Sequence, residues 1–122
     1  MIYSVTITGH VPAKKNGKHA YRGRVVIDPA ARSEADWLTL QLRRWWGRRE
    51  PIGFVNRLGC LCSVRDGRSD LDGKLTTIQD CLVEAGVLVN DSIARVPLIW
   101  CGSNRTTGEE TAEIEIVTEE VR

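Results

Sequence analysis

Three aspartates stand at the two ends of one apolar, helix-like stretch of the sequence. Asp70 and Asp72 precede the stretch, one residue apart, and Asp91 follows it beyond a glycine. Mg²⁺ prefers oxygen ligands and is often held by one or two carboxylates together with substrate phosphates. A bound Mg²⁺ polarises a phosphoryl oxygen and lowers the pKa of a coordinated water. If Gly86 allows a sharp reversal of the chain, Asp91 returns toward the other two acids, and the three suit phosphodiester hydrolysis.

The same acids have a simpler structural interpretation. Acidic side chains at the start of a helix cap its free N–H groups and complement its dipole. An Asp-x-Asp pair before a helix is therefore a weak indication of catalysis. On spacing alone, a structural ion-pair cluster is favoured over a metal site.

The stretch between the acids has the period of an α-helix. Apolar side chains recur at intervals of three and four residues, which places them on one helix face; they are Leu71, Leu75, Ile78, Leu82 and Ala85. Gly86 stands where a left-handed cap usually ends a helix. The pattern predicts a helix over 71–85 with two acids at its N-terminus, followed by a short apolar run over 87–89.

The rest of the chain predicts a β-sheet and a second helix. β-branched and alternating segments indicate strands, and a tryptophan-rich apolar stripe indicates a helix. The predicted strands are 2–8, 24–28, 54–65, 93–101 and 111–117, the second helix is 30–46, and 9–23 and 103–108 are loops. The order is β-β-α-β-α-β-β, so we expect an α/β fold, a mixed sheet with two helices packed on it, as one domain over 1–122.

Charge is distributed unevenly although the formal net charge is only +1. Residues 1–29 hold five basic side chains and one acid, whereas 109–122 holds six glutamates and one arginine. A basic front beside carboxylates suits a polyanion-binding site, and solvated charges are the alternative. The residues expected to contact DNA are Lys14, Lys15, Asn16, Lys18, Arg22, Arg24, Arg65 and Arg68.

Composition excludes several classes of protein. With 42% apolar and 27% charged residues, the chain is not of the disordered type. No apolar run approaches the roughly 20 residues that span a bilayer, and the N-terminus lacks a signal-peptide pattern. The four cysteines lack zinc-site spacing and are expected to be buried free thiols. We expect a cytoplasmic protein with no membrane contact.

The segment SDLDGKLTTIQDCLVEAGVLVNDSIARV, residues 69–96, resembles the signature of RusA-type Holliday-junction resolvases. That family carries Asp-x-Asp-Asn, a lysine shortly after it, an aspartate and a leucine on the same helix, a glycine turn, and an acidic pair before a strand. The matching residues here are Asp70, Asp72, Asp80, Leu82 and Asp91. Pro12 and Asn16 are similar to the family's proline–asparagine loop, and Arg65 and Arg68 stand where it has a basic run.

The resemblance implies a homodimeric endonuclease that depends on Mg²⁺, with Mn²⁺ able to substitute. Such an enzyme resolves four-way DNA junctions by paired symmetric nicks in recombination and repair, and its relatives are typical of phages and prophages. By this resemblance Asp70, Asp72 and Asp91 are the catalytic, metal-binding acids, and Lys74 is a further catalytic candidate that steadies a phosphate.

The sequence departs from the family pattern at three positions. Gly73 replaces the asparagine, Asn90 replaces the first acid of the pair, and Thr76 stands where the lysine is expected. Lys74 lies two residues earlier, a rotation of about 200° on a helix, so it serves only if the helix starts later and leaves it flexible. A catalytically weakened protein that binds branched DNA is the second hypothesis, and an unrelated α/β domain is the third.

Overall fold

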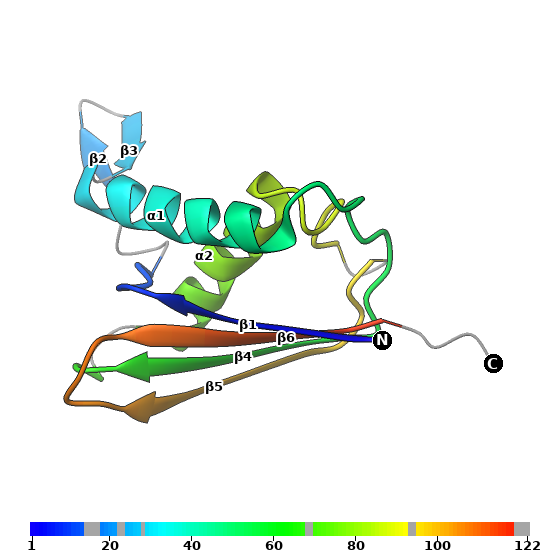
Figure 1. Ribbon diagram of the computed structural model, residues 1–122. Coiled ribbons are helices and arrows are strands. Elements are labelled where there is room, and N and C mark those ends of the chain that lie inside the picture. Colours follow the sequence, from blue (N-terminus) through cyan, green and yellow to red (C-terminus); the bar gives the residue numbers. More distant parts are fainter. Residues whose placement is uncertain (14–17, 22–23, 28, 68–69, 93–94, 119–122) are drawn as a thin grey trace.

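The computed structural model describes residues 1–13, 18–21, 24–27, 29–67, 70–92 and 95–118. Figure 1 shows its helices and strands in chain order. The elements are β1 (Ile2–Thr8), β2 (Lys18–Tyr21), β3 (Arg24–Ile27), α1 (Pro29–Trp46), β4 (Arg57–Val64), α2 (Leu71–Glu84), β5 (Ile99–Arg105) and β6 (Thr111–Val117). None of the helices in these ranges is long and apolar enough to cross a membrane.

Four strands form the main sheet in the order β1-β6-β4-β5. β6 is antiparallel to both of its neighbours, and β4 and β5 are parallel. Both helices pack on one face of this sheet and leave the other face open (Figure 1). The expected α/β fold, a mixed sheet with two helices packed on it, is confirmed.

The core lies between the sheet and the helices. Alternate residues of β4 face inward and are buried, among them Leu58 and Cys60. Leu42 of α1 and Ile78 and Leu82 of α2 are fully buried against them. Each such side chain contributes about 1.5–3 kcal/mol by leaving water. The four cysteines are free thiols, and all but the half-buried Cys101 are buried.

The two helices match their predicted bounds to within one residue. Pro29 occupies the first position of α1, where its missing N–H has no helical partner to lose. Asp70 caps α2, and Gly86 follows with φ +82°, a left-handed conformation that glycine adopts without strain. The predicted strand over 54–65 begins later, at Arg57.

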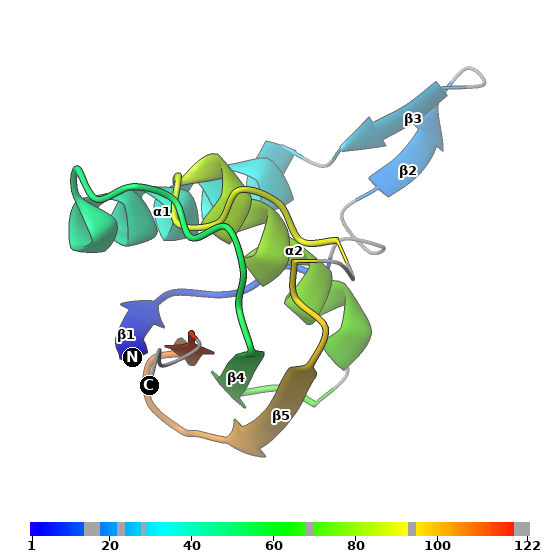
Figure 2. The ribbon, with the colours of Figure 1, turned by 90° about the vertical axis from the view of Figure 1, so that its right-hand side faces the viewer.

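The predicted loop over 9–23 was wrong in part. Residues 18–21 form β2, which pairs with β3 in a separate two-stranded sheet. This hairpin projects away from the main sheet and the helices (Figures 1 and 2). The β-branched run over 25–27 was recognised as a strand, but its partner lies in a polar, lysine-containing segment with little strand signal of its own.

The fifth strand is also displaced from its prediction. β5 runs over Ile99–Arg105 instead of 93–101 and passes through the predicted turn at 103–108. Pro97 cannot donate a ladder hydrogen bond, and the strand begins beyond it. Pairing with β4 extends β5 into its polar C-terminal residues, because Asn104 and Arg105 lie opposite Ser63 and Val64. Backbone pairing therefore outweighs the low β-propensity of this segment.

Candidate functional site

The carboxyl ends of three strands meet at one edge of the main sheet. β1, β4 and β5 run in the same direction, because β6 is antiparallel to β1 and β4 and β5 is parallel to β4. Their arrowheads lie together in Figure 1, and α2 begins beside them. Ligands of α/β proteins commonly bind beyond the carboxyl ends of strands. We call this region the carboxyl edge; its described segments are 8–13, 64–67, 70–74 and 105–111.

Asp70 and Asp72 both lie at the start of α2, at the carboxyl edge. Asp70 is the N-cap of α2, and its Oδ1 accepts a hydrogen bond from the Asp72 backbone N–H at 3.1 Å. Asp72 is exposed, and its carbonyl accepts a hydrogen bond from Thr76 Oγ1 at 3.0 Å. The capping interpretation therefore holds for Asp70. The Asp72 carboxylate has no capping role that the structure records.

Lys74 is buried, with 2% of its surface exposed. Its Nζ donates to the Val11 carbonyl at 2.6 Å, while Thr77 Oγ1 donates to the Pro12 carbonyl, also at 2.6 Å. These bonds fasten the first turns of α2 to the segment that follows β1. Because α2 begins at Leu71, Lys74 is not on a flexible lead-in, and its expected contact with a phosphate is corrected to an internal one.

Sequence periodicity contained a signal for this burial. Lys74 lies three residues after Leu71 and four before Ile78, so it falls on the apolar stripe of α2. Thr76, by contrast, follows Asp72 by four residues and shares its side of the helix. Lysine at position 74 consequently points toward β4, whereas position 76 lies beside Asp72.

A carboxylate–imidazole pair also lies at the carboxyl edge. Glu110 Oε1 lies 2.6 Å from His10 Nδ1, and Glu110 Oε2 accepts the Arg65 backbone N–H at 2.8 Å. Burial acts to raise the pKa of Glu110, but these hydrogen bonds and the nearby Lys74 charge outweigh it and hold that pKa below its ordinary value. Glu110 therefore stays ionised near the buried ammonium. Sequence reasoning missed the pair, because His10 and Glu110 are a hundred residues apart.

Of the expected DNA contacts that the structure describes, Arg65 lies at this edge, and Lys18 and Arg24 belong to the projecting hairpin. Arg65 is exposed, its Nε donates to the Gly108 carbonyl at 2.6 Å, and its own carbonyl accepts from Arg105 at 2.8 Å. Lys18 and Arg24 lie on the strands of the β2–β3 hairpin, which the chain reaches from the carboxyl edge. The others, Lys14, Lys15, Asn16, Arg22 and Arg68, lie outside the described residues.

Asp91 lies away from the other two acids. After Gly86 the chain pairs with Ile52, whose N–H donates to the Val87 carbonyl at 2.8 Å. Figure 1 places this segment where β4 and β5 begin, at the opposite end of the sheet. The fourteen-residue α2 separates the two ends by about 20 Å. The expected return of Asp91 toward Asp70 and Asp72 is not found within one chain.

Two carboxylates suit Mg²⁺, which keeps several of its waters and takes the remaining ligands from phosphates. Among the residues that the structure describes, no three His, Cys, Asp or Glu side chains are grouped so that they could hold a metal. A magnesium site at Asp70 and Asp72 stays a prediction. A metal-binding role for Asp91 stays a prediction.

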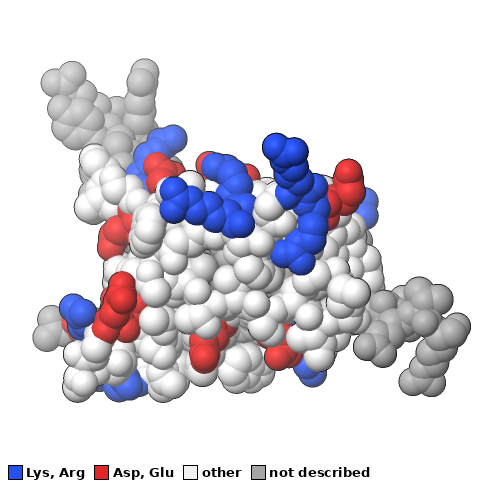
Figure 3. Space-filling model, in the orientation of Figure 1, with Lys and Arg blue, Asp and Glu red and all other residues white. Residues whose placement is uncertain are grey.

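A second basic surface lies over α1. Figure 3 shows Lys and Arg side chains gathered on the side of the molecule where α1 lies. Arg43 and Arg44 occupy the last turn of the helix, and Arg48 follows it; all three are exposed. Arg43 also donates to the Glu84 carbonyl at 3.2 Å, which ties α1 to the end of α2.

Comparisons with known proteins add little to this geometry. No protein-family model and no curated protein matches the sequence. Among solved structures, CetZ from Methanosaeta thermophila strain DSM 6194 aligns with 57% of this chain at 12% identity and a TM-score of 0.37. The aligned part is 16% of that protein, so the chain spans about a sixth of its length. The resemblance to RusA-type resolvases thus rests on the residues of the sequence.

Proposed function

We propose that this chain is a Mg²⁺-dependent endonuclease that resolves four-way DNA junctions by paired symmetric nicks, in the manner of RusA-type resolvases. The observation that carries the proposal is the position of Asp70 and Asp72. Both acids belong to the start of α2, at the carboxyl edge from which the chain leads to the basic β2–β3 hairpin. The proposed setting is DNA recombination and repair in the cytoplasm, with a phage or prophage origin.

The hairpin supports a nucleic-acid partner. Its strands have four residues each and pair only with each other among the described residues. An isolated two-stranded hairpin is only marginally stable in water. Contact with a partner surface would therefore stabilise this hairpin. A two-stranded β-ribbon fits the major groove of B-DNA, and the hairpin sequence carries lysine and arginine.

The metal has a defined place in this proposal. Asp70 and Asp72 would hold Mg²⁺, or Mn²⁺ in its stead, and the ion would supply Lewis acidity at a phosphodiester. Asp91 reaches such a site only as a residue of the second copy in a homodimer, because α2 lies between it and the acids of its own chain. Two exposed cations of the carboxyl edge, Arg65 and Arg105, would bind the DNA strand and orient it for cleavage.

Two observations favour a second candidate, a branched-DNA-binding protein with little or no turnover. The Lys74 ammonium is turned inward onto Val11, and Thr76 occupies the position beside Asp72 where a cation is expected. The separation of Asp91 from the pair adds to this argument. Such a protein would keep the fold, the hairpin and the dimer.

Cleavage of a labelled four-way junction distinguishes the two candidates. We would compare Mg²⁺ with EDTA, and the wild type with Asp72→Asn. Asp36→Asn is the matched control, the same substitution at an exposed site on α1. The endonuclease predicts paired nicks that need both Mg²⁺ and Asp72 and survive Asp36→Asn. Tight, salt-sensitive binding without nicks establishes the second candidate, and equal affinity for linear and branched DNA refutes both.

A gain-of-function variant separates the candidates further. Thr76→Lys restores an ammonium on the Asp72 side of α2, where it can stabilise charge on a phosphate. If the chain is an enzyme weakened by the displaced lysine, this variant nicks junctions faster than the wild type at unchanged affinity. If nicking stays absent in Thr76→Lys, the missing cation is not what limits turnover.

A further inference from the structure

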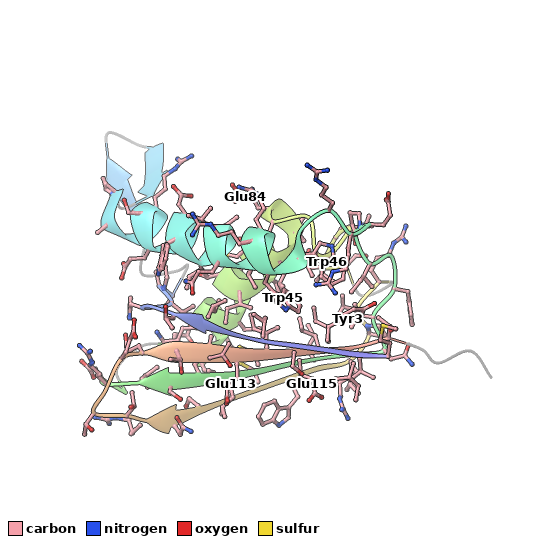
Figure 4. All side chains as sticks on the ribbon, in the orientation of Figure 1. Tyr3, Trp45, Trp46, Glu84, Glu113 and Glu115 are labelled. Atoms are coloured by element: carbon pink, nitrogen blue, oxygen red, sulfur yellow. The ribbon has the colours of Figure 1, made fainter. Side chains whose placement is uncertain are left out.

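The open face of the main sheet carries a hollow of about 830 Å³ on the side away from α1 and α2. Residues of the outward-facing side of the strands line it, chiefly Gly59, Leu61, Trp100, Glu113 and Glu115. Figure 4 shows both glutamates on this face, whereas Tyr3, Trp45 and Trp46 lie between β1 and α1. The hollow is therefore separate from the carboxyl edge and from the core.

Strand register explains why the hollow exists. Gly59 pairs with Trp100 of β5 on one side and with Glu115 of β6 on the other. Since neighbouring strands lie about 4.8 Å apart, the backbones of Trp100 and Glu115 lie nearly 10 Å apart, with only the glycine between them. In the adjacent row, Leu61 stands between Gly102 and Glu113.

Trp100 lies flat on the sheet. A Cβ added to Gly102 would lie 3.2 Å from the indole Cζ2, and one added to Gly59 would lie 3.6 Å from Cε3. The two glycines thus allow one ring face to rest on the backbone of β4 and β5. Trp100 is nevertheless 54% exposed and the neighbouring Leu98 is 55% exposed. An exposed aromatic platform with an apolar rim commonly marks an interaction site.

Charge decides what the platform suits. Glu115 is paired with Arg57 at 3.0 Å, but no ion pair is recorded for the exposed Glu113 among the described residues. Carboxylates beside an indole disfavour phosphates and favour a planar cation, which stacks on the ring and binds the acid. The Arg57–Glu115 pair shows that a guanidinium reaches a carboxylate of this face.

The adjoining strand edge suits an extended partner. β5 is the last strand on its side of the sheet, and its outer backbone groups have no strand partner in the part of the chain that the structure describes. Extended peptides add to such edges through main-chain hydrogen bonds, and alternate side chains provide the specificity. A peptide beside β5 would place every second side chain over the Trp100 face.

We infer that the open face docks an extended, arginine-containing segment of a partner protein. The segment pairs with the edge of β5, and one arginine side chain stacks on Trp100 and binds Glu113. This binding surface is independent of the nuclease proposal, because it shares no residue with the carboxyl edge.

The test uses a synthetic heptapeptide of alternating threonine and arginine, with the same peptide carrying citrulline for arginine as the uncharged, isosteric control. Binding is followed by the indole N–H resonance of Trp100 in ¹⁵N–¹H spectra of the full chain. The arginine peptide should shift this resonance and the citrulline peptide should not. Trp100→Ala and Glu113→Gln should each weaken binding roughly three- to tenfold, as measured by anisotropy of a labelled peptide. Glu109→Gln, at an exposed site outside the hollow, should leave it unchanged.

Several results would overturn the inference. Equal binding of the citrulline peptide would remove the role of charge, and unchanged affinity in Trp100→Ala would remove the platform. A thymidine oligonucleotide that shifts Trp100 in preference to the peptide would identify single-stranded nucleic acid as the occupant. Concentration-dependent dimerisation that Trp100→Ala abolishes would identify a second copy of this chain instead.

Discussion

Arg49 should stabilise the end of α1 more than any neighbouring arginine. Its guanidinium lies 4.1 Å from the centre of the Trp46 ring, and Tyr3 is a further ring neighbour at 5.5 Å. Its Nε donates to the Trp46 carbonyl at 3.0 Å and its Nη2 to the Trp45 carbonyl at 3.1 Å. In return Trp46 Nε1 donates to the Arg49 carbonyl at 3.0 Å. One side chain therefore satisfies two helix-end carbonyls and covers an aromatic cluster.

The expected cost of Arg49→Ala follows from these contacts. The stacking is worth about 0.5–2 kcal/mol, and two charged hydrogen bonds at a partly exposed site add about 1 kcal/mol each. The favourable position at a helix C-terminus adds a few tenths of a kcal/mol. Ordering the long arginine side chain opposes these contributions by about 1 kcal/mol of rotamer entropy. We therefore expect Arg49→Ala to lower the free energy of unfolding by about 2–3 kcal/mol. Arg49→Lys keeps the charge but loses the planar fork, and should cost about 1 kcal/mol.

Urea unfolding followed by circular dichroism measures these differences. Arg48→Ala is the matched control, because it removes the same charge from the adjacent exposed residue and should change stability by less than about 0.5 kcal/mol. Equal losses in Arg49→Ala and Arg48→Ala would refute the reasoning, since net charge alone would then explain both. An Arg49→Lys variant as stable as the wild type would show that the fork and the stacking contribute nothing.

Three further predictions concern α2 and the carboxyl edge. Lys74→Ala should lower the free energy of unfolding in urea by about 3–5 kcal/mol, because it leaves a cavity at a buried site and leaves the Val11 carbonyl without its hydrogen bond. Lys74→Met fills most of that space, so it should cost about 2 kcal/mol less and leave the affinity for a four-way junction unchanged. Gly86→Ala should cost about 1–2 kcal/mol because φ is +82°, while Gly108→Ala, where φ is not positive, should be nearly neutral in the same assay. Glu110 has a folded-state pKa below its ordinary 4.5, so its stabilising contribution is present above that pH and is lost as the pH falls through the lower value. Melting temperatures measured from neutral to about pH 3 should therefore fall less steeply in Glu110→Gln than in the wild type.

Periodicity was enough to predict both helices and most of the sheet. The stripe through Ile78 and Leu82 and the glycine after Ala85 determine where α2 lies and where it ends, because local signals and burial agree there. The alternation in residues 111–117 likewise predicted β6, whose Ala112 and Ile114 are buried as expected. Such elements can be predicted from the sequence because the spacing of apolar residues within each segment shows which of its faces is buried.

Features that depend on contacts between residues far apart in the sequence could not be predicted from local patterns. β5 includes polar residues such as Asn104 because β4 supplies hydrogen bonds to them. The pairing of His10 with Glu110 joins the end of β1 to the start of β6, and no local pattern connects the two. The position of Asp91 was misjudged for a related reason, since the chain after Gly86 is drawn to Ile52 at the far end of the sheet instead of turning back along α2.

The side chains of the first turn of α2 bear on both candidate functions, the endonuclease and the DNA-binding protein without turnover. Asp72 and Thr76 share the outward side of the helix, whereas Lys74 projects inward and holds Val11. A lysine moved by two positions thus becomes part of the core, because two residues turn the helix by about 200°. The carboxyl edge has its two acids and its exposed arginines, but among the residues that the structure describes no lysine lies on the Asp72 side of α2. Binding of a polyanion needs only the exposed cations, while turnover also needs charge stabilisation at the reacting phosphate. The exposed cations therefore support the proposed DNA binding more than the proposed cleavage, and residue 76 is the position at which we expect the two candidate functions to separate.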